Sequence, residues 1–265
     1  MNIYPMRFRT IASGSSGNAY YLGLAGQHFL IDAGVSGKRI QQALFQMNVR
    51  QLSGIFITHE HSDHISGAGV MARRFNADVY AAPLTWRYFL RSRCLGALTE
   101  SQVKVIEPDK PLVIGGVEIT AFDIPHDATQ PVGYAFHAGE QKMVLATDLG
   151  HVTDSIKERL KNAGLLLLES NYDPDMLAKS SYPRFLKSRI MSTLGHLSNA
   201  EAGMLLSEVV TPGVTHVVLA HLSEENNTPT LAFDTVRRIL DGNNVVVRNL
   251  QVAARHVPGE VVEYE

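Results

Sequence analysis

Six consecutive residues, HEHSDH at 59–64, contain four side chains of the types that bind first-row metal ions. His59 and His61 can reach one ion from an extended segment, whereas Asp63 and His64 can reach a second ion from the turn into a helix. Imidazole and carboxylate groups are common ligands of zinc, manganese and iron. A polar loop in which Asp63 caps a helix would use the same residues. Four residues of ligand type in six positions favour a metal site, because Asp and His are poor core residues.

Three further ligand-type residues each follow an apolar run that is typical of a buried strand. His126 follows ITAFDIP, Asp148 follows MVLAT, and His221 follows VVLA. Any one of them alone would more often be a turn residue. Because all three share the position at the end of a strand, where a rigid scaffold can hold a site, we expect them to complete the ligand set.

The elements that must position these residues follow from the hydrophobic periodicity of the chain. The pattern predicts strands at 8–12, 18–24, 28–33, 54–58, 79–82, 103–106, 117–124, 132–137, 143–147, 165–168, 217–220 and 244–248. It predicts helices at 38–47, 67–75, 156–162, 176–180, 200–209 and 230–240. Two strand-rich halves, each followed by helices, indicate an α/β (α+β) fold with two sheets face to face and helices outside. No linker interrupts 1–265, so we expect a single domain.

Composition narrows the class of protein. The chain has 265 residues, of which 45% are hydrophobic and 19% charged, as in an ordinary globular protein. A net charge of −2, from 24 basic and 26 acidic residues, excludes a protein that coats nucleic acid through a basic surface all round, but it allows a local basic groove. Cys94 is the only cysteine, which excludes an internal disulfide. No apolar run approaches the roughly 20 residues of a membrane span and no signal-peptide core is visible, so we expect a cytoplasmic protein without a membrane partner.

The ligand motifs, together with Asp32 in LIDAG, resemble those of the metallo-β-lactamase-fold hydrolase superfamily. They occur in the superfamily's order from Asp32 through THEHSDH, His126 and LATD to LAHLS at His221. The resemblance implies a four-layer αββα sandwich of two mixed sheets, with two divalent metal ions, zinc or manganese before iron, between the sheet edges.

A closer resemblance is to the YycJ/WalJ subgroup, through ASGSSGN, DAGVSGKRI, THEHSDHISG, ESNYD, LGHLSN and LAHLSEENN. This resemblance implies a binuclear metal-dependent phosphodiesterase, specifically a 5′→3′ exonuclease on double-stranded DNA that uses a metal-bridging hydroxide as nucleophile. The partner it implies is a nucleic acid substrate, a duplex DNA end.

The resemblance also implies a role for each motif residue. It assigns the first metal ion to His59, His61 and His126, the second to Asp63, His64 and His221, and a bridging position to Asp148. Asp63 would also accept a hydrogen bond from the nucleophile, and Asp32 would orient a histidine ligand. His196 in GHLSN matches a catalytic histidine of RNA-processing relatives and would protonate the leaving oxygen or hold the scissile phosphate. A buried structural histidine is the alternative for His196.

Two other segments are candidates for contact with substrate. The loop SGSSGN at 13–18 is a turn by composition, and the family resemblance adds Ser15, Ser16 and Asn18 as residues at the rim of the site. The segment YPRFLKSR at 182–189 places Arg184 and Lys187 among aromatic residues, which suits a nucleic-acid backbone. A solvated helix face with two core aromatics is the alternative for that segment.

Several other functions use the same metal centre. An RNA-processing nuclease or a small-molecule phosphodiesterase would have the same ligands. Hydrolysis of a thioester, lactone or β-lactam is less favoured, because only 44 residues follow His221 and they leave no room for an added substrate domain. A redox diiron site typically has Glu where His61 stands. A DNA-end binder without chemistry would not need an intact ligand set.

Overall fold

The computed structural model describes residues 4–211 and 213–264, and the chain forms two compact units. Unit 1 comprises Met1–Asp123, Ala128–Gln141 and Ala254–Glu265, and unit 2 comprises Ile124–Asp127 and Lys142–Ala253. The HEHSDH motif belongs to unit 1, whereas His126, Asp148, His196 and His221 belong to unit 2. The expectation of one domain over 1–265 stays a prediction.

Unit 1 is built on a seven-stranded mixed sheet in the order β14-β1-β2-β3-β4-β5-β6. Its strands are β1 Met6–Ala12, β2 Ala19–Leu24, β3 Gln27–Ile31, β4 Gly54–Phe56, β5 Val79–Ala81, β6 Val103–Val105 and β14 Val262–Tyr264. The four strands from β14 to β3 pair antiparallel, and β3 to β6 pair parallel. The carboxyl ends of β3 and β4 therefore share one edge of the sheet, and Asp32 and the HEHSDH motif follow them there.

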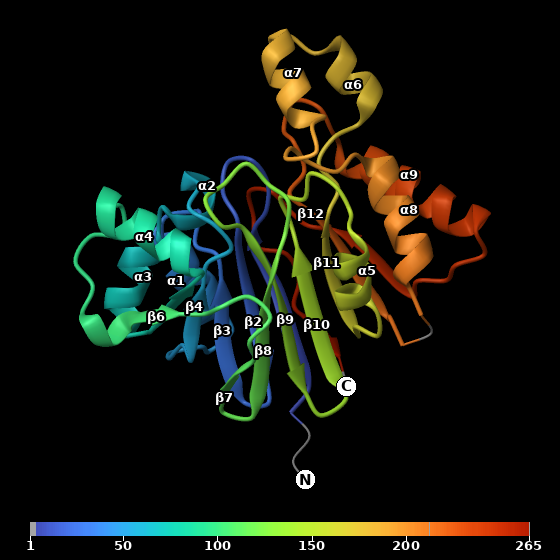
Figure 1. Cartoon of the computed structure of the whole chain (residues 1–265). Helices are drawn as coiled ribbons and strands as arrows, with labels where there is room; N and C mark the ends of the chain where they lie inside the picture. The colour runs from blue at the N-terminus through green and yellow to red at the C-terminus, as the bar shows by residue number, and fades with distance from the viewer. Residues whose placement is uncertain (1–3, 212, 265) are drawn as a thin grey trace. The chain divides into compact units, whose positions relative to one another are not determined.

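Helices cover one face of this sheet. They are α1 Gly37–Gln46, α2 Ser62–Ile65, α3 Ala68–Phe75 and α4 Pro83–Ser92, with a 3₁₀ turn at Glu100–Gln102 before β6. The helical side chains of Ile40, Met71 and Trp86 join a core cluster with Ile55 and Val79 from the strands. Figure 1 shows α1, α3 and α4 grouped beside the strands from β3 to β6.

The opposite face of the sheet packs on an antiparallel meander of β7 Leu112–Ile114, β8 Val117–Asp123 and β9 Val132–Ala138. Aromatic rings fill this interface. The ring centroids of Phe56 lie 5.5 Å from Tyr134 and 5.3 Å from Phe136. Phe56 points to this face and its neighbour Ile55 to the helices, as the two-residue period of a strand requires. The expected face-to-face packing of strands is thus present within unit 1.

Unit 2 contains four parallel strands in the order β10-β11-β12-β13. They are β10 Gln141–Ala146, β11 Leu165–Glu169, β12 His216–Ala220 and β13 Asn249–Val252. The runs MVLA, LLLL and VVLA are fully buried, as expected of parallel strands covered on both faces. Because the strands are parallel, the residues that follow β10, β11 and β12 emerge at the same edge.

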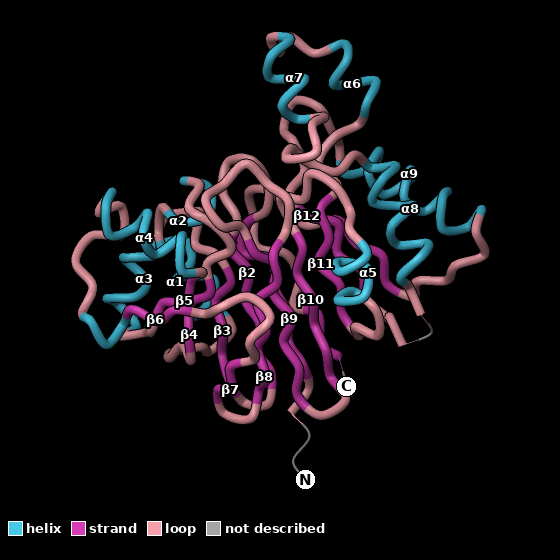
Figure 2. Tube along the Cα trace, viewed as in Figure 1, coloured by secondary structure: helices cyan, strands magenta, loops and turns pink. Residues whose placement is uncertain are grey.

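The helices of unit 2 are α5 Asp154–Leu160, α6 Pro174–Lys179, α7 Arg184–Ile190, α8 Asn199–Val209 and α9 Pro229–Gly242. Ser198 and Glu201 form a capping box at the start of α8. Helices α8 and α9 lie side by side, and α9 also contacts β13. Helices α6 and α7 instead project away from the strands of their unit (Figures 1 and 2).

The elements differ from the sequence-based expectations in a few places. The strand predicted at 244–248 is wrong: α9 continues to Gly242, and the strand lies at Asn249–Val252. The predicted ranges also leave out five elements, namely α2, α4, α7, β7 and β14. No helix in the described part of the chain is long and apolar enough to cross a membrane.

Candidate metal centre

In unit 1, Asp32 follows β3 and holds the chain that follows β4. Its carboxylate is fully buried and accepts hydrogen bonds from the backbone N–H of Thr58 at 2.9 Å and from the Thr58 hydroxyl at 2.9 Å. The imidazole Nδ1 of His64 lies 2.8 Å from Asp32 Oδ2. Burial raises the pKa of Asp32, and its bonds to His64 and Thr58 offset only part of that rise. Asp32 therefore holds the ring of His64 in place, and its role beside a metal ligand, which the family resemblance implies, stays a prediction.

The hydrogen bonds around His64 also determine which of its nitrogens carries the proton. Asn18 Oδ1 accepts from the backbone N–H of Gly14 at 2.9 Å and from the Tyr20 hydroxyl at 3.1 Å, so its Nδ2 is the donor. That Nδ2 lies 3.1 Å from His64 Nε2, which must then accept. His64 is consequently protonated on Nδ1 and carries its lone pair on Nε2, the state that binds a metal ion.

The approach of the Asp32 loop to the metal motif requires a glycine at position 34. A Cβ at Gly34 would lie 1.5 Å from the carbonyl oxygen of Asp63. Backbone hydrogen bonds from Asn18 to Asp63, from Gly34 to Asn18 and from Ala33 to His64, each 2.7 Å long, join the three segments. This contact explains the glycine in the DAGVSG sequence.

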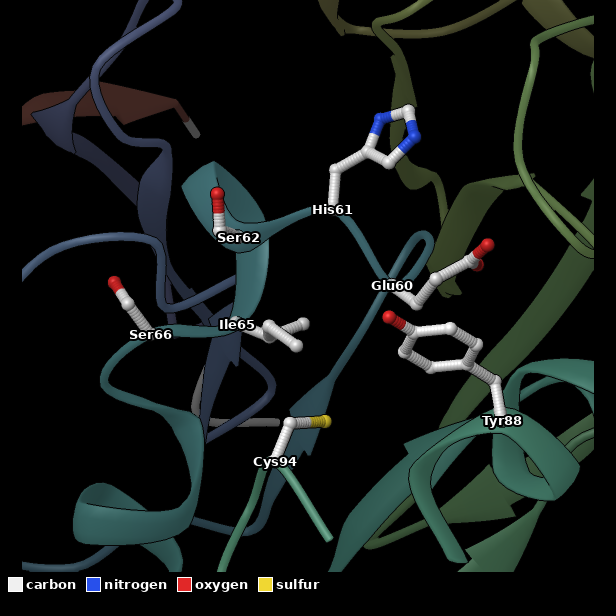
Figure 3. A pocket seen from close by; sticks show the side chains of 7 residues that line it. All are labelled: Glu60, His61, Ser62, Ile65, Ser66, Tyr88 and Cys94. Atoms are coloured by element: carbon white, nitrogen blue, oxygen red, sulfur yellow. The ribbon is translucent and has the colours of Figure 1, made fainter. Parts of the chain in front are cut away.

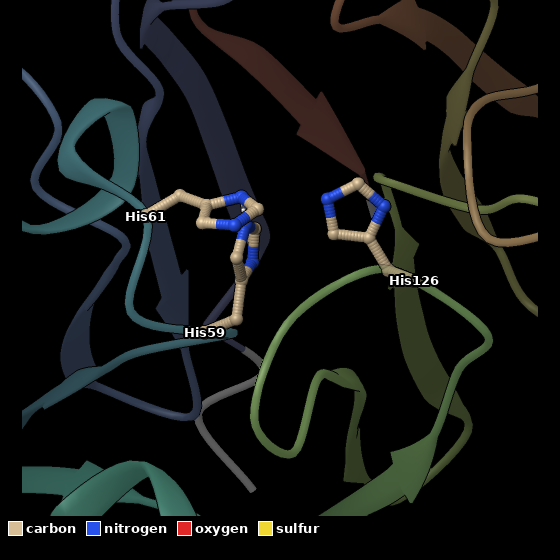
Figure 4. Close-up of side chains that lie close together, drawn as sticks. All are labelled: His59, His61 and His126. Atoms are coloured by element: carbon tan, nitrogen blue, oxygen red, sulfur yellow. Dashed lines mark hydrogen bonds between the residues drawn. The ribbon is translucent and has the colours of Figure 1, made fainter. Parts of the chain in front are cut away.

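His59 and His61 form a close pair at the carboxyl end of β4 (Figure 4). Their rings meet edge to face with centroids 4.6 Å apart, and His59 Nε2 lies 3.0 Å from His61 Nδ1. A tetrahedral ion with Zn–N bonds of about 2.0–2.1 Å holds its ligand nitrogens about 3.3 Å apart. The spacing of the two nitrogens is close to that of two ligands of one ion, and the assignment of His59 and His61 to a shared ion stays a prediction.

A cavity of about 580 Å³ adjoins this pair in unit 1 (Figure 3). It is lined by Glu60, His61, Ser62, Ile65, Ser66, Tyr88 and Cys94. Cys94 is exposed. The cavity is large enough for a nucleotide-sized ligand and opens beside one of the candidate ligands.

Replacing Asp32 by alanine should weaken both the fold and the metal site. The change leaves a buried imidazole, a hydroxyl and a backbone N–H without their shared acceptor, which costs about 3 kcal/mol of unfolding free energy, and metal affinity should fall by about 10–100-fold. Urea unfolding and zinc titration measure the two effects. Asp109→Ala is the matched control, because Asp109 has the same left-handed backbone (φ 62° against 54°) but is exposed. Equal losses in the two variants would contradict the role of Asp32.

In unit 2, the candidate ligands sit at the ends of parallel strands in an uncommon backbone conformation. Asp148 follows β10 and His221 follows β12, with φ of 59° and 55°. A left-handed residue other than glycine is uncommon and is typical of functional sites. Both side chains are buried, and Asp148 Oδ1 lies 3.3 Å from His221 Nδ1. The placement at strand ends that the sequence predicts is confirmed.

A carboxylate not recognised in the sequence, Glu169, organises the histidines of unit 2. It is the last residue of β11, and its Oε1 lies 2.7 Å from His196 Nδ1 and 2.9 Å from His221 Nδ1. Its Oε2 accepts from the backbone N–H groups of Leu149 at 2.7 Å and Leu197 at 3.1 Å. Burial opposes the charge of Glu169, but its interactions with His196 and His221 outweigh burial and hold its pKa well below the usual range. The ionised carboxylate thus fixes both imidazoles with the proton on Nδ1.

His126 is oriented in the same way by a backbone carbonyl. It lies in the loop after β8 (Figure 4), and its Nδ1 donates to the carbonyl oxygen of Gly195 at 3.1 Å. Its Nε2 lies 3.7 Å from Asp148 Oδ1. Burial lowers the pKa of His126 more than the nearby carboxylates raise it, which favours the neutral, metal-binding imidazole.

Potential metal ligands and the carboxylate that orients them lie close together in unit 2. One ligand atom from each of Asp148, Glu169, His196 and His221 lies within 4.8 Å of the other three. Neutral imidazole and carboxylate suit zinc, manganese and iron, and the orienting carboxylate and carbonyl are the partners that metal-binding histidines usually have. A metal-binding role for the His and Asp residues is therefore supported by their chemistry and by their orientation.

The candidate substrate residues lie in different surroundings. Ser15 and Ser16 are exposed in a turn closed by a 2.9 Å hydrogen bond from Gly17 to Gly14, whereas Asn18 contacts His64. Arg184 is exposed on α7, but Lys187 Nζ is bonded to the carbonyl oxygens of Ala178 and Ser180. Of this group, Asn18 contacts the metal-binding residues and Lys187 is part of the local structure.

Replacing Glu169 by glutamine should impair the site with little change in shape. A neutral amide cannot hold two Nδ1–H donors as strongly, so we expect metal affinity or turnover to fall by about 10–100-fold. Metal titration and turnover at saturating metal separate the two effects. Glu208→Gln, on the exposed side of α8, is the control. Unchanged affinity and turnover in Glu169→Gln would show that Glu169 does not orient the histidines.

Two mixed sheets with helices, and potential metal ligands at the ends of the strands, match a known protein family. Residues 27–222 match the family described as the β-lactamase superfamily domain. The chain therefore belongs to the β-lactamase superfamily, and the expected fold class, with two mixed sheets and helices, is confirmed. The metallo-β-lactamase-fold protein YhfI from Bacillus subtilis is a structural neighbour with a TM-score of 0.72; the match covers 98% of this chain and 99% of that one at 20% identity.

Within the superfamily, the chain is similar to two proteins with named activities. It is 39% identical over 239 residues to the exodeoxyribonuclease YycJ of Bacillus anthracis, and this match covers 89% of each chain. It is 40% identical over 232 residues to the exodeoxyribonuclease WalJ of Streptococcus pneumoniae, which covers 87% of this chain and 86% of the relative. The resemblance to the YycJ/WalJ subgroup is thereby confirmed.

Proposed function

We propose that the protein is a binuclear metal-dependent phosphodiesterase that degrades double-stranded DNA as a 5′→3′ exonuclease. The observation that carries this proposal is the near-full-length similarity to two proteins named exodeoxyribonucleases. The orientation of the histidines supports it, because His64, His126, His196 and His221 all bond to an acceptor through Nδ1, so that Nε2 is the ring nitrogen through which each would contact a cation or a phosphate. A DNA substrate fits the cytoplasmic location expected from the sequence.

We propose that the donors of the two units hold two common cations, zinc or manganese before iron. His59, His61 and His126 would hold one ion, Asp63, His64 and His221 the other, and Asp148 both. The pairing of His59 with His61 and the orientation of His64 by Asp32 support these assignments. Histidine at position 61 favours hydrolysis over diiron redox chemistry.

The chain's own residues would move the protons of the reaction. When bound, two divalent cations would activate water and stabilise the charge on the phosphate. Asp63, 23% exposed at its side chain and at the start of α2, would accept a hydrogen bond from the attacking water. Carrying a second proton on Nε2, His196 would give that proton to the leaving oxygen, while Glu169 would accept from Nδ1–H and hold the ring in place.

Timed digestion of a 5′-phosphorylated duplex by manganese-loaded protein tests the proposal. We expect stepwise release of mononucleotides from the phosphorylated end and none from the Asp148→Ala variant. A 5′-hydroxyl duplex and a matched RNA test the end and the sugar. Faster cleavage of the RNA would assign the protein to RNA processing. No cleavage of any nucleic acid by metal-loaded protein would redirect the search to small phosphodiesters and then to thioesters, lactones and β-lactams.

A further inference from the structure

Helices α6 and α7 form a projecting arm, residues 174–190, that is held together by its own small core. Tyr172, Leu177 and Ile190 form a small core cluster against which Tyr182 and Leu186 pack. Lys187 Nζ donates to the carbonyl oxygens of Ala178 at 2.7 Å and Ser180 at 2.9 Å, which ties α7 to the end of α6. The arm therefore has its own packing and its own polar connection.

Phe185 lies outside that core. It is 75% exposed, more than any other aromatic side chain in the described residues. The alternative that both aromatics of this segment are core residues is wrong for Phe185, although Tyr182 does pack against the cluster. A single exposed apolar side chain is common on protein surfaces. Whether Phe185 binds a ligand must therefore be judged from the charged residues near it and from the hydrogen bonds that join the arm to the rest of unit 2.

The charge of α7 is of one sign. Arg184, Lys187 and Arg189 lie within its seven residues, which include no acidic side chain. Acidic groups lie instead near Tyr182, where burial and then the charges of Glu225 and Glu224 raise the pKa of that phenol. Lys187 bonds within the arm and Arg189 pairs with Asp127, so Arg184 is the cation that the helix offers beside Phe185. A cation next to an exposed aromatic ring is the combination that suits a phosphate backbone with a base stacked beside it.

The base of the arm is connected to the metal-binding residues of unit 2. The backbone N–H of His196 donates to the carbonyl oxygen of Ile190 at 2.9 Å. A Cβ at Gly195 would lie 2.2 Å from that same oxygen, so the backbone at position 195 packs directly against the end of α7. Arg189 pairs with Asp127, the neighbour of His126. A ligand seated on the arm is thus held at a fixed position relative to His126 and His196.

We propose that the α6–α7 arm binds the end of the duplex, with Phe185 stacked on the terminal base pair and Arg184 against the phosphate backbone. The proposal rests on the function proposed above and identifies how the DNA end is held. A flat aromatic ring stacks on any base, so this contact suits an enzyme that removes successive nucleotides of any sequence. Arg184 supplies the charge that is independent of sequence.

The test compares Phe185→Ala with Val246→Ala, an equally exposed apolar residue of the same unit at 78% exposure. The probe is a blunt hairpin duplex with phosphorothioate linkages and 2-aminopurine at its 5′ end. We expect Phe185→Ala to bind about tenfold more weakly, the scale of losing one base-stacking aromatic, and to lose the 2-aminopurine signal. Phe185→Trp should restore both. The ratio of duplex digestion to hydrolysis of bis(p-nitrophenyl) phosphate should fall about tenfold in Phe185→Ala, with unchanged melting temperature and metal content.

Arg184→Gln, compared with Arg238→Gln on the exposed face of α9, should lower the slope of log affinity against log salt by about 1. If Phe185→Ala binds and digests the duplex as well as the wild-type protein does, the arm proposal is wrong, while the proposed nuclease function still stands. An equal loss on single-stranded DNA would overturn the assignment to the duplex end. Wild-type protein that cuts the small ester but no DNA would overturn the proposed function and this inference together.

Discussion

Replacing Asp148 by alanine should abolish nuclease activity and release metal. Asp148 is buried at the end of β10, with Oδ1 3.3 Å from His221 Nδ1 and 3.7 Å from His126 Nε2. Its loss removes the charge that balances a cation among these imidazoles, so activity should fall by roughly a thousandfold, the upper range for losing one preorganised electrostatic group. Duplex digestion and metal analysis of the same purified sample measure both effects.

Asp148→Asn controls for the fold. Asparagine tolerates the left-handed backbone that Asp148 adopts and keeps the shape of the side chain. This variant should remain folded by circular dichroism and still lose metal and activity. Full activity in either variant would remove Asp148 from the site.

Replacing His196 by alanine should eliminate turnover while metal stays bound. Its side chain is 20% exposed, compared with 3% for His221, so it is the histidine of this cluster with access to substrate. Loss of a general acid lowers turnover by about 10²–10⁴-fold. Single-turnover digestion together with metal analysis distinguishes a catalytic group from a ligand.

Two results would change this assignment. Loss of metal from His196→Ala would make His196 a ligand, a role that its position within 4.8 Å of the other three donors allows. A substrate with a better leaving group, such as a nitrophenyl ester, needs less protonation, so His196→Ala should lose less activity on it than on DNA. Equal losses on both substrates would contradict the role as general acid.

The positions of the candidate ligand residues could be predicted from the sequence because each one interrupts an obvious hydrophobic pattern. Asp148 and His221 follow buried strands, and the metal motif follows β4, as expected. The parallel strands were visible as runs such as VVLA and LLLL, whose burial fixes them as strands. The three-residue edge strands β7 and β14 could not be predicted from the sequence. They are too short for a clear alternation of apolar and polar residues, and they are strands because they pair with β8 and β1.

Glu169 could not be assigned a role from the sequence, although the rule that found its neighbours applies to it. It ends an apolar strand, as the candidate ligands do. Its importance depends on register, because parallel pairing of Glu169 with Ala220 places it next to His221. The pairs Arg189–Asp127 and Lys187–Ser180 likewise depend on tertiary structure. Contacts of this kind carry no periodic signal.

The left-handed backbone at Asp148 has a consequence for protein engineering. Holding a residue other than glycine in that conformation costs about 1–3 kcal/mol, and the buried strands around β10 maintain it. A glycine at this position would relieve the cost and remove the carboxylate in a single substitution. Selection for heat resistance alone would therefore favour inactive proteins, and any thermostability screen of this chain must select for activity in the same round.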